Sequence, residues 1–314
     1  MLSKPAWLAA LLFALLFTLL SPIGLHFLIR RGLAAPRVRE RGNPGELGLP
    51  WQEVRFPTAN GKRLGAWLIP AGAGAPALVL LHGWGSNAEM MLALAPALHR
   101  AGYSLLLVDA RNHGMSDDDS YASLPRFAED LEHAIDWLKA QPGTDPEHIG
   151  VIGHSVGAAA ALLAASRRCD IRAVVSLAAF AHPEAMMRRW VSARGVPYWP
   201  LGWYILRYVE RVIGHRFDAI APCHAIRRIA CPVLLMHGTD DDTVPLADAH
   251  QIFASRPHDR VELLALAGGH DECREVEIQL ARMVEFLDRE MRGAGSSGSS
   301  PEVSARDSGA PAEE

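Results

Sequence analysis

Short apolar runs alternate with helix-like stretches through the middle of the chain. Runs that are apolar at nearly every position are typical of parallel strands covered by helices on both faces, so the pattern predicts an α/β fold. The expected strands are Ala77–Leu81, Ser104–Val108, Ile149–Ile152, Ala173–Leu177, Val233–Met236 and Val261–Leu266. The stretches with helical spacing are Ala88–Arg100, Leu124–Ala140, Val156–Ser166, Leu246–Ser255 and Glu272–Met291.

An antiparallel pair of strands is expected before the first of these runs. Trp51–Thr58 and Arg63–Ile69 alternate apolar and polar residues on either side of Asn60-Gly61. Asn-Gly between two such segments is a strong hairpin signal, because both residues accept the backbone conformation of a tight turn. The domain therefore begins with a β-hairpin.

The N-terminal segment predicts a membrane anchor at residues 1–31. Residues 5–29 contain no Lys, Arg, Asp or Glu, and about 20 helical residues cross a bilayer core. A cleaved secretory signal and a buried helix are the alternatives. Lys4 precedes the span and five arginines follow it, which predicts a single-pass membrane protein with its catalytic domain facing the cytoplasm. They are Arg30, Arg31, Arg37, Arg39 and Arg41.

Three further segments follow from the same pattern. Residues 32–50 are expected to be a linker, and residues 51–292 one α/β domain, a normal size for such a fold. Residues 293–314 are mostly Gly, Ser, Pro, Ala and acidic residues. Such a segment buries too little apolar surface to fold, so a disordered tail is predicted.

Charge and cysteine content limit the partners and cofactors that the chain is expected to bind. The net charge is −4, so no general basic surface indicates a nucleic-acid partner. The four cysteines form no C-x-x-C pair and accompany no histidine cluster with zinc-ligand spacing. We therefore predict neither a metal nor an organic cofactor. Composition does not predict the oligomeric state.

A candidate nucleophile follows the strand expected at Ile149–Ile152. There the chain reads G-H-S-V-G at residues 153–157 and continues into an Ala-rich helix. In a G-x-S-x-G elbow, small flanking residues let the backbone turn sharply and expose the serine hydroxyl. The pattern predicts Ser155 as the nucleophile, and a glycine-rich turn without chemistry is the alternative.

A candidate acid and base follow later strands, in the chain order Ser, Asp, His that this elbow requires. Residues 240–242 are three aspartates, which follow Val233–Met236 after H-G-T at residues 237–239. One of them could orient an imidazole, although a cation-binding or helix-capping loop would look similar. Of the 14 histidines, His250, His258 and His270 follow the aspartates. His250 falls in an expected helix and His258 in a connection, whereas His270 follows two glycines after a strand end, so His270 is the predicted base.

A candidate oxyanion hole comes from two backbone N–H groups. Residues 82–87 read H-G-W-G-S-N between a strand and a helix, where a turn of small residues can aim an N–H group at a developing negative charge. We predict the N–H groups of Trp84 and Val156. A phosphate-binding loop is the alternative, but neither of its glycine-rich motifs is present here.

The ordered motifs resemble those of the α/β-hydrolase superfamily, in particular its single-domain serine hydrolases. They are H-G-x-G at 82–85, D-A-R-N-H-G-x-S at 109–116, G-H-S-x-G at 153–157, H-G-x-x-D-x-x-V-P at 237–245 and G-G-H at 268–270. The resemblance implies an α/β-hydrolase domain over residues 51–292 with a mostly parallel central sheet flanked by helices. It assigns the nucleophile to Ser155, the acid to Asp241 and the base to His270. It also implies that Asp109 and His113 brace the neighbouring loop.

An insertion between Leu177 and Cys231 is expected to form a small helical cap at about residues 179–222, which the resemblance places over the active-site mouth. Its aromatic residues could pack on the sheet, line an acyl pocket or form an interfacial patch. They are Trp190, Tyr198, Trp199, Trp203, Tyr204 and Tyr208. Because arginines outnumber acidic residues in this segment, contact with anionic lipid headgroups is a further hypothesis.

Together these features predict a serine hydrolase that cleaves carboxylic esters through an acyl-enzyme. Thioesters and lipid-like acyl esters fit the same machinery, and the anchor makes the chain similar to membrane-anchored bacterial carboxylesterase-like or acyl-hydrolase members of the superfamily. A peptidase or amidase with the same triad is one alternative. A catalytically silent, membrane-tethered binding module is the other.

Overall fold

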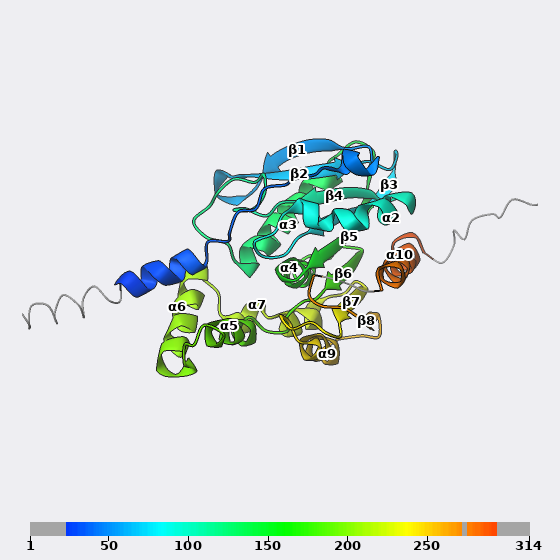
Figure 1. Cartoon of the computed structure of the whole chain (residues 1–314). Helices are drawn as coiled ribbons and strands as arrows, with labels where there is room; N and C mark the ends of the chain where they lie inside the picture. The colour runs from blue at the N-terminus through cyan, green and yellow to red at the C-terminus, as the bar shows by residue number, and fades with distance from the viewer. Residues whose placement is uncertain (1–22, 272–274, 294–314) are drawn as a thin grey trace, which may run out of the picture.

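The computed structural model describes residues 23–271 and 275–293, which form an eight-stranded sheet of order β1-β2-β4-β3-β5-β6-β7-β8 (Figure 1). β2 is antiparallel to both of its neighbours, and the other pairs are parallel. The predicted α/β class with a mostly parallel sheet is thus confirmed. The strands are β1 (Gln52–Pro57), β2 (Arg63–Ile69), β3 (Ala75–Leu81), β4 (Ser104–Val108), β5 (Thr144–His154), β6 (Ala173–Leu177), β7 (Val233–Gly238) and β8 (Val261–Leu266).

Helices cover both faces of the sheet, and successive strand residues alternate between the two cores. In β3, Val79 and Leu81 join the core with α3 and α4, whereas Leu78 and Leu80 join the core with α2 and α10. This two-sided burial explains why the strands read as continuous apolar runs. Besides the N-terminal helix of residues 23–32, the helices outside the β6–β7 connection are η1 (Pro44–Leu47), η2 (Ala59–Gly61), η3 (Ala88–Leu94), α2 (Ala95–Arg100), α3 (Leu124–Lys139), α4 (Val156–Ala165), α9 (Leu246–Ala254) and α10 (Val276–Arg292).

The expected elements differ from the observed ones at a few boundaries. The stretch Ala88–Arg100 forms the 3-10 helix η3 followed by α2, because Pro96 lies in the first turn of α2 and has no N–H to continue an earlier helix. At the predicted hairpin, Asn60 and Gly61 have φ of 58° and 65° and join β1 to β2. β5 begins at Thr144, before the expected run. Its pairing with β3 shifts in register between Thr144 and Ile149.

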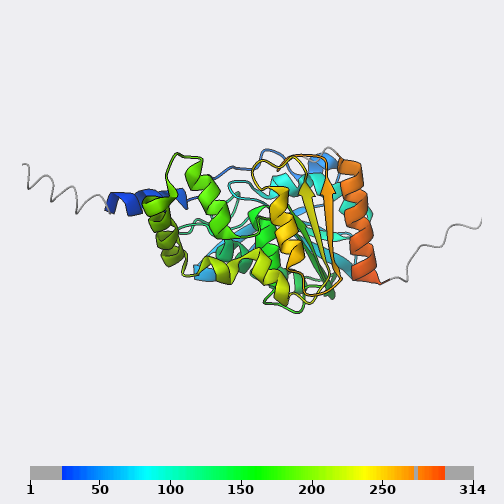
Figure 2. The same ribbon diagram turned by 90° about the horizontal axis from the view of Figure 1, so that it is seen from below.

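The chain between β6 and β7 forms the predicted helical insertion, which we call the cap. It packs at one end of the molecule, next to the N-terminal helix of residues 23–32 (Figures 1 and 2). Its helices are α5 (Pro183–Ser192), η4 (Tyr198–Gly202), α6 (Trp203–Ile213), α7 (Phe217–Ile220), α8 (Pro222–Ala225) and η5 (Ile226–Arg228).

The predicted anchor and tail fall mainly on residues 1–22 and 294–314, outside the described residues. Within residues 23–271 and 275–293, no helix has the length and apolarity needed to cross a bilayer. The segment expected to be a linker lies along the domain: Leu33 is buried, and Arg37 Nη1 donates to the carbonyls of Gly114 and Ser116 at 2.6 and 2.8 Å.

Candidate active site

Ser155 lies on a sharp turn between β5 and α4. Its φ of 54° and ψ of −116° are unusual for a residue with a side chain, and its N–H donates to the carbonyl of Leu177 at 2.8 Å. A Cβ at residue 157 would lie 2.4 Å from the carbonyl oxygens of both Leu81 and His82. Only glycine at 157 allows α4 to approach the end of β3 so closely. This close packing holds the turn at Ser155 in its strained backbone conformation.

The three side chains predicted for the triad lie in one chain of hydrogen bonds. His270 Nε2 is 2.9 Å from Ser155 Oγ, and His270 Nδ1 is 2.7 Å from Asp241 Oδ2. A carboxylate only accepts, so Nδ1 carries the imidazole proton and donates it to Asp241. Nε2 is therefore the unprotonated nitrogen, which accepts the hydroxyl proton of Ser155. These are the positions that a nucleophile, a base and an orienting acid require.

Asp241 is distinguished from the neighbouring aspartates by its surroundings. Its side chain is completely buried, and its Oδ1 accepts the N–H groups of Thr243 at 2.9 Å and Val244 at 2.7 Å. These donors hold the carboxylate so that Oδ2 points at His270. The side chain of Asp242 is exposed instead and contacts the Thr243 hydroxyl at 3.3 Å.

The two predicted oxyanion donors flank the serine. Val156 is the first residue of α4, where N–H groups have no acceptor within the helix. Trp84 lies in a turn closed by the Ser86 N–H and the Gly83 carbonyl at 3.4 Å. A Cβ at residue 83 would be 3.3 Å from Ser155 Cβ, so this turn passes directly beside the nucleophile.

Two buried histidines support the turn of residues 83–86. His113 Nε2 accepts the Gly85 N–H at 3.1 Å. His82 Nε2 accepts the Ala110 N–H at 3.2 Å, so Nδ1 carries the proton and donates to the Gly83 carbonyl at 2.6 Å. Burial lowers the pKa of His82 to about 3 and that of His113 to about 4, so both rings are neutral near pH 7.

Asp109 supports the same region from β4. It accepts the N–H groups of Ala88 at 2.7 Å and Met115 at 2.9 Å. Burial, and then the neighbouring Glu40 carboxyl, raise the pKa of Asp109. Both Asp109 and His113 thus contact the loops that they were expected to brace.

His154 contacts the loop that carries the base, which the sequence patterns did not indicate. Its Nε2–H donates to the carbonyl oxygen of His270 at 2.9 Å, and the two rings are 5.1 Å apart. Burial lowers the pKa of His154. The position next to the serine was the only available signal, because the contact joins residues 116 positions apart.

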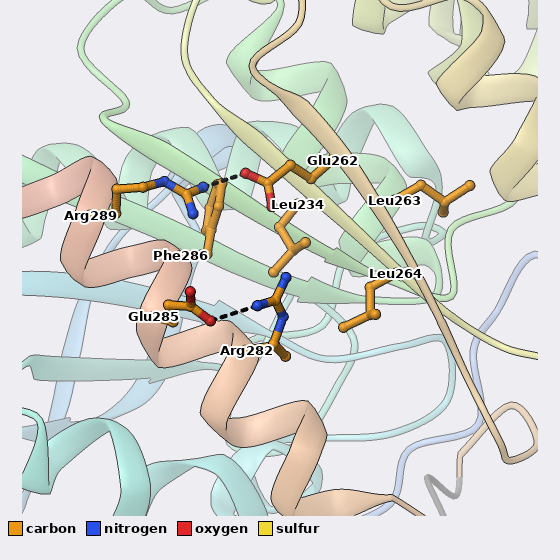
Figure 3. A pocket seen from close by; sticks show the side chains of 8 residues that line it. All are labelled: Leu234, Glu262, Leu263, Leu264, Arg282, Glu285, Phe286 and Arg289. Carbon is orange, nitrogen blue, oxygen red and sulfur yellow. Dashed lines mark hydrogen bonds and ion pairs between the residues drawn. The ribbon is translucent and has the colours of Figure 1, made fainter.

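A cavity of about 140 Å³ opens beside His270. Its lining comes from η3, the ends of β6, β7 and β8 and the start of the loop after Gly269, and includes Met90, Met91, Leu94, Leu177, Met236 and Leu266. Ala178, directly after β6, also lines it, but none of its lining residues belongs to a helix of the cap. A smaller cavity of about 40 Å³ lies between β8 and α10, around Phe286 and the ion pair of Arg289 and Glu262 (Figure 3). It contains none of the predicted site residues.

Among the residues that the structure describes, two groups of side chains have metal-ligand atoms close together. One is His154, His270 and Asp271, of which His270 already bonds the serine and Asp241. The other is His182, Asp218 and His224 in the cap. There His182 Nδ1 accepts the Glu184 N–H at 3.2 Å, so Nε2 carries the proton that Asp218 accepts. A metal at Nε2 would require the opposite tautomer, which disfavours this cluster as a metal site.

Comparisons with known proteins identify the superfamily of this chain. The α/β-hydrolase-fold profile matches residues 76–205. An uncharacterized protein of Mycobacterium tuberculosis is 30% identical over 75% of this chain and 79% of its own length. An esterase of Pyrococcus furiosus superposes with a TM-score of 0.68 and 26% identity, covering 82% of this chain and 98% of the esterase. The chain belongs to the α/β-hydrolase superfamily.

Two fungal relatives resemble a shorter part of this α/β-hydrolase. A polyketide transferase of Stachybotrys chlorohalonatus is 36% identical over 40% of this chain and 44% of its own length. A thiohydrolase of Aspergillus aculeatus is 35% identical over 40% of this chain and 41% of its own length. By their names, the similar proteins thus include an esterase, a thiohydrolase and a polyketide transferase.

Proposed function

We propose that this α/β-hydrolase is a serine hydrolase that cleaves carboxylic esters, with thioesters and lipid-like acyl esters as related substrates. The observation that carries the proposal is His270, whose ring lies 2.9 Å from the Ser155 hydroxyl and 2.7 Å from the buried Asp241 carboxylate. A neutral imidazole held between a hydroxyl and a carboxylate activates the hydroxyl as a nucleophile.

The reaction begins when Ser155 Oγ attacks the substrate carbonyl carbon and its proton moves to His270 Nε2. The carbonyl oxygen becomes an oxyanion, which the N–H groups of Trp84 and Val156 stabilise. As the carbon–oxygen or carbon–sulfur bond to the leaving group breaks, His270 gives its proton to the departing alcohol or thiol. Asp241 stays ionised and stabilises the imidazolium.

Water completes the cycle. His270 takes a proton from a water molecule as its oxygen attacks the acyl-enzyme carbonyl, and then returns that proton to Ser155 Oγ when the carboxylic acid leaves. The cavity beside His270 offers an apolar surface for one arm of the substrate, because methionine and leucine side chains line much of it. The substrate arm is therefore proposed to lie under η3 and not under the cap.

A fluorophosphonate serine probe tests the nucleophile. Wild-type full-length protein should be labelled, and Ser155→Ala should lose the label. Ser166→Ala, at the other end of α4, is the matched control and should keep it. Labelling that persists in Ser155→Ala would contradict the proposal, as would a folded wild-type protein that takes no label in detergent or lipid.

The alternative peptidase or amidase uses the same three side chains. The esterase and thiohydrolase relatives favour esters and thioesters. A panel of p-nitrophenyl esters of increasing acyl length, each paired with its anilide, separates the two. Ester cleavage should exceed anilide cleavage at every length, and comparable rates would favour an amidase.

We also propose that residues 1–31 anchor the protein as a single-pass membrane protein with the catalytic domain in the cytoplasm. The charge-free stretch 5–29 and the arginines after it support this orientation. Alkaline carbonate should leave the full chain in the membrane, and sealed vesicles with the cytoplasmic side inward should protect the domain from added protease. Release by carbonate would contradict the anchor, and digestion would contradict the orientation.

A further inference from the structure

The helix of residues 23–32 packs against helix α6 of the cap. The His26 ring stacks on Tyr208 with centroids 3.9 Å apart, and its Nε2 is 2.6 Å from the Tyr204 hydroxyl. Arg30 Nε donates to the Tyr208 hydroxyl at 3.1 Å. Both ribbon views show the two elements side by side (Figures 1 and 2). The N-terminal helix and the cap therefore form one surface, although 178 positions of sequence separate them.

Large apolar side chains remain exposed around this contact. Trp199 is 70% exposed, Phe27 65% and Leu28 64%, and Trp199 lies 5.7 Å from Trp203 between ring centroids. Exposed apolar groups that gather in one region mark a binding surface more often than isolated ones do. We call this set the cap–helix face and define it as Phe27, Leu28, Trp190, Trp199, Leu201 and Trp203.

Arginines surround the same face. The Arg194 guanidinium lies 3.4 Å from the centre of the Trp190 ring, and Arg211 is exposed on α6. The nearby acids are paired: Glu184 and Glu210 contact Arg207 at 2.9 and 2.8 Å, and Glu210 also contacts Arg216 at 3.5 Å. The exposed arginines in this region are Arg30, Arg31, Arg188, Arg194 and Arg211. The N-terminal helix and the cap thus expose both large apolar side chains and arginines.

Tryptophan beside arginine suits the boundary between lipid headgroups and acyl chains, where each side chain keeps one end apolar and one end wet. The chain also reaches this face from residues 5–22, which contain no charged residue. We propose that the cap–helix face lies in the headgroup region of a bilayer that contains anionic phospholipid. The cap then rests on the membrane beside the anchor and does not cover the cavity at His270.

Tryptophan quenching by brominated phospholipid tests this placement in the full chain, reconstituted into nanodiscs that contain phosphatidylglycerol. Trp199→Phe and Trp203→Phe should each remove part of the quenchable emission. Trp51→Phe is the matched control because Trp51 is 37% exposed and Trp203 42%, but Trp51 lies beside β1. Equal quenchable emission in all four proteins would overturn the proposal.

Charge reversal tests the anionic lipid. Arg194→Glu and Arg211→Glu should reduce the quenching of Trp199 and Trp203 in discs with phosphatidylglycerol. Arg256→Glu should not reduce this quenching, although Arg256, which follows α9, also stacks on an aromatic ring, that of Phe253 within α9, at 4.0 Å. Equal quenching in discs of phosphatidylcholine alone would overturn the requirement for anionic lipid. Dimerisation that depends on Trp203, without quenching, would assign the face to a second copy of the chain. Neither the quenching nor the dimerisation measurement depends on hydrolase activity.

Discussion

The triad and the cap–helix face hold their side chains in opposite ways. Asp241 is buried and hydrogen-bonded by two backbone N–H groups as well as His270, whereas Trp199 is 70% exposed. Buried polar groups need partners because an unpaired one costs about 1–3 kcal/mol. Exposed rings pay no such cost and remain available for another surface. The proposed catalytic geometry therefore depends on the interior of the fold, and the proposed membrane contact depends on an insertion at its edge.

The largest expected effect separates Asp241 from the aspartate beside it. Asp241→Asn should lower kcat by about 10³–10⁴-fold, because an amide can donate to His270 and favour the wrong tautomer of the ring. Asp242→Asn should change kcat less than about threefold, since its side chain is exposed and contacts only Thr243 among the described partners. Steady-state kinetics on a short ester measures both. A loss in Asp242→Asn as large as that in Asp241→Asn would contradict the assignment of the acid.

The second prediction compares the loss of stability caused by a methyl group at Gly157, beside Ser155, with that at Gly195 in the cap. Gly157→Ala should destabilise the protein by about 3 kcal/mol or more, because its methyl would meet the carbonyl oxygens of Leu81 and His82 at 2.4 Å. Gly195→Ala in the cap has open space, and only its φ of 73° opposes a side chain, which costs about 1–2 kcal/mol. Denaturant unfolding of both variants checks the order. Equal losses would mean that the elbow relaxes more easily than its contacts imply.

Acid should lower the stability of the folded protein through His113, which accepts the Gly85 N–H. The folded pKa of His113 is about 4, below the ordinary value of 6.5, so the unfolded chain binds a proton first as pH falls. This contribution to stability is complete above pH 6.5 and is lost towards pH 4, by about 2 kcal/mol at pH 5.

The variant His113→Gln isolates this contribution, because glutamine keeps a donor and an acceptor but does not titrate. The free energy of unfolding should fall less between pH 7 and pH 5 in this variant than in the wild type. An identical fall in both proteins would show that His113 does not titrate as expected.

The fold and the positions of the triad were accessible from sequence because they depend on short-range patterns. Runs such as Val233–Met236 predict strands, and the carboxyl ends of parallel strands meet at one edge of the sheet. Ser155, Asp241 and His270 each follow such a run, so topology alone brings them together. The strand pattern alone left open which of three adjacent aspartates faces the base. The resemblance to the superfamily assigned Asp241, and in the structure its carboxylate lies 2.7 Å from His270.

Long-range contacts between loops were not accessible. The bond of His154 to the His270 carbonyl depends on how the glycine loop folds back over the sheet, which no local pattern encodes. The aromatic content of the cap indicated an acyl pocket, a packed subdomain or an interfacial patch equally well. The contacts of His26 with Tyr204 and Tyr208 show which side of α6 the N-terminal helix covers.

The smallest expected effect distinguishes binding from folding within one helix. Leu206 on α6 is fully buried, so Leu206→Ala should cost about 2–5 kcal/mol of stability. Trp203→Ala, one turn earlier, should cost less than about 1 kcal/mol in the absence of lipid, because its ring is 42% exposed. Thermal and denaturant unfolding in detergent measure both. A cost for Trp203→Ala close to that of Leu206→Ala would make the ring part of the core of the cap. A small loss of stability would instead mean that folding does not require the exposed ring of Trp203. The proposed contact with the bilayer would then account for that apolar surface.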